Sequence, residues 1–198
     1  IAPNEVAVQG QAKVVNYFDA QDRLITQTWG GTNSSGVVAG GSISYVRELV
    51  NQGVDPNNPD LPRSKVAVVD RNGNEKVFYY SASHHLVKKE EKTRNIRPGD
   101  PTSFITEYKY SSSTGLLKEA VNPEGNRTVY EYDEANPDQS QRGNMLSVTQ
   151  YPGVKGGDQA FRKITYQYEP VYSQAWKVTE TRGNDPTYQP QNGGTNTP

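Results

Sequence analysis

The sequence predicts an all-β fold of consecutive antiparallel β-hairpins, forming a twisted, curved or spiralling sheet with Gly/Pro-rich loop insertions. Short runs of alternating apolar and polar residues recur along the chain and end in clusters of Gly, Asn, Asp and Pro. The chain has 13 tyrosines but only 4 phenylalanines, with 18 glycines and 13 prolines, a composition typical of turn-rich sheets. Two Tyr-x-Tyr pairs, Tyr108 with Tyr110 and Tyr130 with Tyr132, lie 22 residues apart. A period of this size is typical of stacked supersecondary units.

The first half of the chain is expected to hold two hairpins separated by a region rich in insertions. The strands expected there are residues 11–18, 23–29, 65–70 and 75–81. Asn72-Gly73 lies between the last two, and both residues tolerate positive φ, which makes this the strongest short hairpin signal in the chain. Residues 30–61 form the insertion-rich region, in which 42–50 is either a strand or a short helix. The prolines of 55–60 exclude regular pairing there.

The second half is expected to continue the array of hairpins to residue 184. The strands expected there are residues 85–93, 103–110, 116–121, 127–133, 143–149, 162–168 and 174–181. The best repeat spans 106–149, and the polar stretch 134–142 is an insertion within it. Residues 185–198 have nothing to bury, so we expect a disordered tail.

The tyrosine pairs are expected to form the core. Alternate residues of a strand share a face, so both rings of each Tyr-x-Tyr pair should lie on one side, with the rings of adjacent units side by side. Such cross-strand pairs stabilise a sheet by about 0.2–1 kcal/mol each. The alternative is that exposed rings, above all Trp29 and Trp176, stack on sugars. We favour the core interpretation.

Composition excludes several classes of function. With 21 basic and 22 acidic residues the charge is balanced, so we expect no nucleic-acid partner. There is no cysteine, hence no disulfide, zinc-thiolate site or Cys nucleophile. No apolar run approaches the ~18–20 residues that span a bilayer. The chain begins at Ile1, and we expect it to be a piece of a longer protein.

No pattern of residues indicates a catalytic, cofactor or metal site. His84 and His85 would point to opposite faces of a strand and could not easily bind one metal ion. Residues 55–60 carry oxygen ligands but lack the Gly and distal Glu of an EF-hand loop. The carboxylate pairs Glu90-Glu91 and Glu131 with Asp133 suit turn and edge positions better than glycosidase chemistry, which needs both groups to face a cleft. We therefore expect a protein that is not an enzyme and has no cofactor.

The repeat resembles a known family. Tyr108-x-Tyr110, Gly115-Leu116-Leu117, Asn122-Pro123-x-Gly125-Asn126-x-Thr128-x-Tyr130-x-Tyr132-Asp133 and Gly143-Asn144-x-Leu146 resemble the Rhs or YD repeat, YxYDxxGRLxxxxDPxGxxTxYxYDxxGNL. Partial matches lie at 16–24, at 70–80 and at 166–184, giving four or five units. The structural positions of the repeat are Tyr108, Tyr110, Gly115, Gly125, Tyr130, Tyr132, Asp133, Gly143, Tyr166 and Tyr168.

The resemblance implies a non-catalytic scaffold. In Rhs proteins, toxin-complex subunits and teneurins such repeats form a sheet that spirals into a shell. We therefore expect a secreted or bacterial surface protein whose partners are other repeats of its parent chain, copies of itself, cell-surface glycans or a protein of another cell. The alternatives are a carbohydrate-binding adhesive module and, with less support, a hydrolase.

Overall fold

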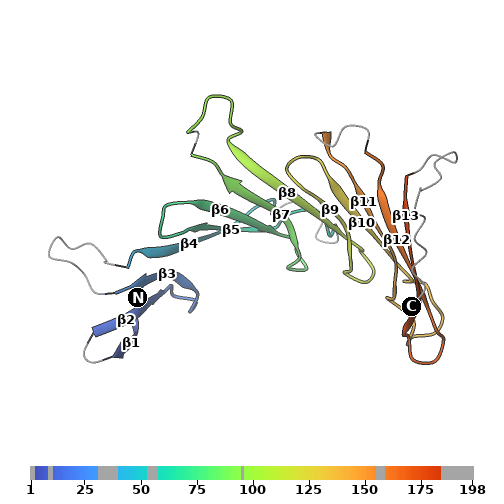
Figure 1. Cartoon of the computed structure of the whole chain (residues 1–198). Coiled ribbons are helices and arrows are strands. Elements are labelled where there is room, and N and C mark those ends of the chain that lie inside the picture. Colours follow the sequence, from blue (N-terminus) through green and yellow to red (C-terminus); the bar gives the residue numbers. More distant parts are fainter. Residues whose placement is uncertain are drawn as a thin grey trace. The chain divides into compact units, whose positions relative to one another are not determined.

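The computed structural model contains β-strands and no α-helix among its described residues. It describes residues 3–8, 11–30, 40–52, 58–94, 96–154 and 159–183, with the backbone alone for 3–8 and 11–13. The predicted all-β class is confirmed (Figure 1). In these described ranges no helix is long and apolar enough to cross a membrane.

The strands follow one another with short connections at most places. Their bounds are β1 Pro3–Val8, β2 Gln11–Phe18, β3 Leu24–Trp29, β4 Ser42–Leu49, β5 Ser64–Val69, β6 Glu75–Tyr80, β7 Leu86–Lys92, β8 Ser103–Tyr110, β9 Leu117–Val121, β10 Arg127–Tyr132, β11 Met145–Tyr151, β12 Arg162–Tyr168 and β13 Ala175–Arg182.

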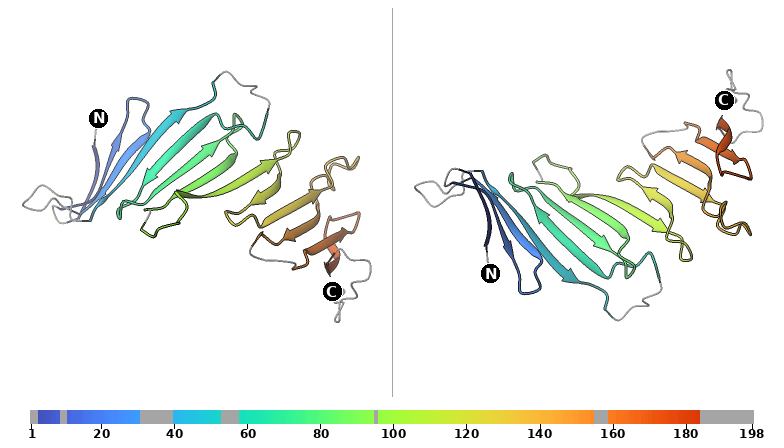
Figure 2. Two further views of the ribbon diagram at one scale, coloured as in Figure 1. Left: turned by 90° about the horizontal axis from the view of Figure 1, so that it is seen from above. Right: turned by 90° about the horizontal axis from the view of Figure 1, so that it is seen from below.

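The chain folds as two compact units. The first consists of Ile1–Val54 with Leu61–Ile105, and the second of Asp55–Asp60 with Thr106–Pro198. In the first unit each strand from β1 to β6 pairs antiparallel with the next strand along the chain. In the second, β8 to β12 do the same, so the predicted consecutive hairpins are confirmed (Figures 1 and 2).

Three strands of the structure differ from the strands expected from the sequence. Residues 42–49, for which a short helix was an open alternative, form strand β4. Strand β1 was not predicted, and its partner β2 holds it in the register Pro3↔Tyr17. The strand expected from residue 85 begins at Leu86. Parts of the insertion-rich region 30–61 and the whole of the expected tail 185–198 lie outside the described residues.

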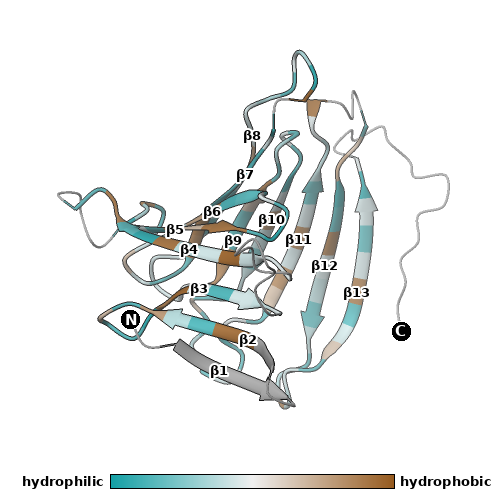
Figure 3. Ribbon diagram, turned by 90° about the vertical axis from the view of Figure 1, so that its left-hand side faces the viewer, coloured by the Kyte–Doolittle hydropathy of each residue, from teal (hydrophilic) through white to brown (hydrophobic). Residues whose placement is uncertain are grey.

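Each unit is a single layer of sheet. Among the described residues of each unit, the contacts between strands join neighbours in the sheet, and Figure 3 shows hydrophilic and hydrophobic residues interspersed along the strands. The buried apolar side chains among the described residues are Val77 and Val87. More of the buried residues are polar: Ser81, Glu90, Thr106, Ser111, Gln141, Ser147 and Thr149. Without a second layer, small side chains are buried only because longer neighbours on the same face cover them.

Candidate functional site: the repeated hairpin ends

Five hairpin ends share one arrangement that begins at an aromatic residue. These residues are Phe18, Tyr80, Tyr110, Tyr132 and Tyr168. The residue after each aromatic donates its N–H to the carbonyl of the residue just before the next strand, at 2.8 to 3.0 Å. The donors and acceptors are Asp19 and Arg23, Ser81 and His85, Ser111 and Leu116, Asp133 and Asn144, and Glu169 and Gln174. The hairpin is therefore closed by the same main-chain bond five times.

A left-handed residue precedes the closing residue at all five ends. Its φ is 58° at Asp22, 62° at His84, 72° at Gly115, 90° at Gly143 and 55° at Ser173. Glycine adopts such angles without strain because it has no Cβ. Gly115 and Gly143 thus meet a backbone requirement, and the other three ends tolerate a side chain there.

Each end also contains a β-bulge. The register shifts just before the aromatic residue, so one residue of the opposite strand has no partner. These extra residues are Ile25, Val87, Lys118, Leu146 and Trp176. Met145, not Leu146, pairs with Tyr132 as Leu117 pairs with Tyr110, which corrects the alignment of Gly143-Asn144-x-Leu146 by one residue. Bulges bend a strand and increase its twist, so every repeat imposes the same local deformation.

The side chain that follows the aromatic residue caps the turn. Asp19 Oδ1 accepts hydrogen bonds from the N–H groups of Gln21 and Arg23, both at 2.9 Å. The Glu169 carboxylate accepts the N–H of Val171 at 2.8 Å in the same way. Ser81 Oγ accepts the N–H of His85 at 3.2 Å. A short oxygen-bearing side chain at this position satisfies turn donors that would otherwise be left to water.

A second kind of turn closes two other hairpins. Gly73 donates to Asp70 O and Asp70 donates to Asn74 O, both at 2.9 Å. In the second hairpin Gly125 donates to Asn122 O and Asn122 donates to Asn126 O, again at 2.9 Å. The hairpin predicted from Asn72-Gly73 is confirmed, but only Gly73, at 76°, has a positive φ. One left-handed residue is therefore enough to close this turn.

The tyrosines of each Tyr-x-Tyr pair are half-buried rather than part of a closed core. Burial raises the pKa of Tyr110, Tyr132 and Tyr168, and the first tyrosine of each pair adds a smaller electrostatic contribution. The two tyrosines of a pair are alternate residues of one strand and share a face.

The expected contact of ring with ring between neighbouring strands is not found for these pairs. Tyr108, Tyr130 and Tyr166 stand opposite Ala120, Val148 and Val178. The pairs lie on β8, β10 and β12, so an intervening strand with small aliphatic residues separates them. The ring contact among the described residues joins Tyr151 and Phe161, with centroids 5.6 Å apart. Tyrosine against aliphatic side chains is thus the repeated packing unit.

Charged side chains link the strands on the other face of the second unit. Glu119 lies between two cations, with Lys109 Nζ at 2.7 Å and Arg127 Nη1 at 3.1 Å. These bonds lower the pKa of Glu119, Lys109 contributing most. The Arg127 guanidinium lies 4.3 Å from the centre of the Tyr151 ring. A row of charged side chains therefore runs from β8 to β10 and ends against the Tyr151 ring on β11.

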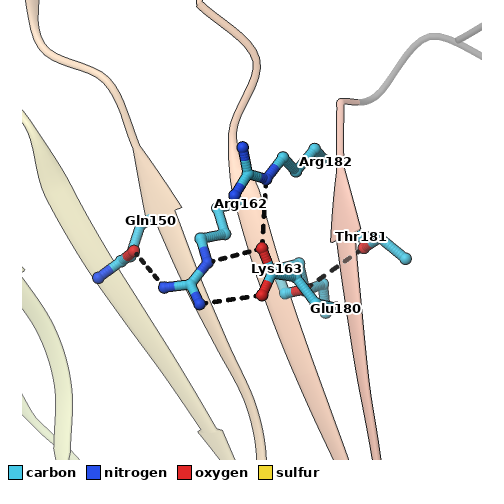
Figure 4. A network of polar contacts seen from close by, with 6 residues as sticks. All are labelled: Gln150, Arg162, Lys163, Glu180, Thr181 and Arg182. Carbon is cyan, nitrogen blue, oxygen red and sulfur yellow. Dashed lines mark hydrogen bonds and ion pairs between the residues drawn. The ribbon is translucent and has the colours of Figure 1, made fainter. Parts of the chain in front are cut away.

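A second ionic cluster joins β12 to β13 (Figure 4). Arg162 binds both carboxylate oxygens of Glu180, Nε to Oε1 at 2.9 Å and Nη2 to Oε2 at 3.0 Å. Arg182 Nε adds a contact to Oε1 at 3.2 Å. The two guanidinium groups lower the pKa of Glu180 to about 2, with Arg162 the larger cause. Glu180 is therefore a structural anion at neutral pH.

The two tryptophans differ in what covers them. The Arg71 guanidinium lies 5.3 Å from the centre of the Trp29 ring, and Trp29 is half-buried. Trp176 is the extra residue of its bulge and is 52% exposed. Of the two residues expected as sugar contacts, Trp176 is therefore the one that presents an open ring. The two tryptophans also belong to different units.

The remaining candidates serve the turns and strands. His84 and His85 lie in a turn and not on a strand as expected, and His84 has the left-handed φ. Hydrogen bonds lower the pKa of Glu90, Glu91 and Glu131, chiefly from Lys92, Lys76 and Ser147. These carboxylates are therefore ionised at neutral pH. Among the residues that the structure describes, no group of three His, Cys, Asp or Glu could hold a metal ion.

The inserted loop 134–142 is attached to the next hairpin end. Gln141 is 8% exposed and donates through Nε2 to Pro170 O at 2.9 Å and to Glu169 O at 3.2 Å. Ser173 Oγ donates to Ser140 O at 2.8 Å. The sequence indicated only a polar insertion, since no local pattern encodes a contact with a turn some 30 residues away.

Gly153 is a second feature that sequence reasoning missed. A Cβ at this position would lie 2.3 Å from Glu124 O and 2.7 Å from Asn126 N. The strand end therefore passes directly against the Asn122–Asn126 turn, and Val154 donates to Glu124 O at 3.3 Å. The Pro152-Gly153 pair signals a turn but not this close approach.

Comparison with known proteins gives a coarse likeness in fold. No family model matches the chain, and no curated protein matches it. A match to the crystal structure of TcdB2-TccC3-Cdc42 has 16% identity and a TM-score of 0.46 and covers 90% of this chain. A match to the crystal structure of TcdB2-TccC3-TEV has 14% identity and a TM-score of 0.24 and covers 87%. The protein spans 9% and 12% of those toxin-complex chains, and the likeness assigns neither family nor function.

Proposed function

We propose that this chain is a non-catalytic structural segment of a secreted or surface-exposed Rhs/YD-repeat protein. It would build the wall of a β-shell, or an extended surface for contact between cells or for toxin delivery. The observation that supports the proposal is the hairpin end that recurs five times, each with an aromatic residue, a bulge, a closing bond and a left-handed residue. Its partners would be other repeats of the parent chain or copies of itself.

The packing suits a wall better than an enzyme. A single layer of sheet exposes both faces, and the carboxylates of Glu119, Glu131 and Glu180 have pKa values lowered by neighbouring cations and hydroxyls. A general acid at neutral pH would instead need a raised pKa. The repeated local geometry also allows further units to be added without a new kind of contact.

The test is to disrupt the hairpin ends within the parent protein. Gly115→Val with Gly143→Val places β-branched residues at two left-handed positions, so we expect lost strand protection in hydrogen exchange and a broken wall in electron micrographs. Ser112→Val, at an exposed position of the Ser111–Leu116 turn, is the control and should leave both unchanged. An intact particle that had lost a hydrolytic activity would show the segment to be catalytic.

A second candidate function rests on the exposure of Trp176. Its ring is 52% exposed, and the neighbouring Tyr172 is 78% exposed. Open aromatic rings bind the apolar faces of sugars, so the chain could be an adhesive module. Binding to a glycan array that is lost in Trp176→Ala and kept in Trp29→Phe would favour this function.

A further inference from the structure

A groove of about 470 Å³ lies where the inserted loop 134–142 meets the β12–β13 hairpin end, within the second unit. Its volume is in the range of small-molecule sites. The lining residues are Asp133, Asn136, Asp138, Gln141, Asn144, Leu146, Tyr166, Gln167, Tyr168 and Pro170. Aromatic and apolar groups thus lie together with amides and carboxylates.

The apolar part is held in place by the sheet. Tyr166 and Tyr168 are alternate residues of β12 and share a face. The Tyr168 hydroxyl donates to Met145 O at 2.9 Å, which fixes that ring. Leu146, the extra residue of the neighbouring bulge, is 40% exposed. A ligand ring therefore has a preformed surface to pack against.

The polar part is fixed by its own hydrogen bonds. Asn136 Nδ2 donates to Asp133 Oδ2 at 2.6 Å, and Asn144 Nδ2 donates to Gln141 Oε1 at 2.9 Å. Gln141 is 8% exposed and is anchored on the next hairpin end. These amides are ordered without a ligand, which lowers the entropy cost of binding.

We propose that this groove binds a neutral saccharide of one or two sugar units. Sugar hydroxyls both donate and accept, as do the side-chain amides of Asn136 and Asn144. The apolar faces of sugars pack on aromatic rings such as Tyr166. The lining has two carboxylates and no Lys or Arg, which disfavours phosphate and other anions.

A cationic ligand is the competing chemistry, because Asp133 and Asp138 lie in the wall. Both carboxylates already accept bonds from within the loop: Asp133 Oδ2 from Asn136 at 2.6 Å, and Asp138 Oδ1 from Ser140 Oγ at 2.8 Å. The four side-chain amides of the lining, Asn136, Gln141, Asn144 and Gln167, outnumber these carboxylates, and an amide can both donate to and accept from a hydroxyl. This proposal goes beyond the scaffold function. The scaffold function is tested by assembly of the parent protein, so either proposal can fail without the other.

The experiment is saturation-transfer NMR of the whole chain with neutral hexoses, N-acetylhexosamines and disaccharides, followed by titration of those that bind. We expect Tyr166→Ala and Leu146→Ala each to weaken binding about tenfold, a loss of ~1.4 kcal/mol. Leu146 is 40% exposed, so its truncation perturbs the fold less than that of Tyr166 and tests the groove even if Tyr166→Ala is poorly folded. Val154→Ala, at a 92% exposed position of the same unit outside the groove lining, is the control and should leave affinity unchanged.

Asp138→Asn separates the two chemistries. It removes charge and keeps the shape, so a neutral sugar should bind within about twofold of its original affinity. The proposal is overturned if no sugar gives a transfer signal, if Leu146→Ala leaves affinity intact, or if lysine or arginine methyl esters bind and Asp138→Asn abolishes that binding.

Discussion

Replacing Tyr130 by alanine tests whether half-buried tyrosines hold a single layer of sheet together. The ring stands opposite Val148 on β11 and is half-buried. A fully buried tyrosine removes 150–250 Å² from water, so this ring removes roughly 100 Å². At about 25 cal/mol per Å² the loss is ~2 kcal/mol after allowance for the methyl group that remains. For a chain of this size, that corresponds to a melting temperature lower by about 4–8 °C.

The matched control is Tyr172→Ala. Tyr172 belongs to the same unit but is 78% exposed in the Glu169–Ser173 turn, so its loss should change the melting temperature by about 1 °C or less. Circular dichroism against temperature, repeated in urea, measures both variants. Melting temperatures that agree within about 1 °C would refute the idea that the repeat's tyrosines provide the stability of the sheet.

Three further predictions follow from single contacts. Gly153→Ala places a methyl group 2.3 Å from Glu124 O and should cost about 1–3 kcal/mol in urea unfolding. A loss below about 0.5 kcal/mol, the size typical of surface substitutions, would contradict the close approach. The pKa of Glu180 is lowered to about 2 from 4.5, so its stabilisation is present above pH ~4.5 and is lost as the pH falls towards ~2. Glu180→Gln should therefore melt with a weaker dependence on pH than the native chain between pH ~5 and ~3, and equal slopes would show that the Arg162 contact adds nothing. Gln141→Ala removes the bonds to Glu169 O and Pro170 O and should speed hydrogen exchange by about tenfold at the bonded amides of Gly143 and Gln174. Faster exchange at Gly143 alone would show that the loop does not brace the next hairpin.

The sequence predicted most of the hairpins because their signals are local. Glycines at left-handed positions, such as Gly73, Gly115 and Gly143, mark turns whatever lies beyond them. Strand β4 remained ambiguous, since alternation over a short run is compatible with a helix until a partner strand is known. Strand β1 precedes the first clear turn and was missed for the same reason: its register comes from β2.

The parts that could not be predicted depend on residues distant in sequence. Gln141 contacts a turn that begins at Glu169, and Gly153 passes against Glu124. Neither partner shares a local pattern with the residue it contacts. The groove beside Tyr166 arises from the same kind of contact, because an insertion in one repeat folds onto the end of the next.

The expectation of stacked rings failed for a reason that explains the fold. A repeat of two strands places its tyrosines on every second strand, so the strand between must supply residues small enough to fit beside them. Ala120 and Val148 have that size. The tyrosine pairs and the aliphatic strands are thus two halves of one packing unit, and enlarging Ala120 should disturb the sheet as truncating Tyr108 would. Because this unit is complete within each repeat, the sheet needs no second layer, and both of its faces stay open for neighbours or ligands.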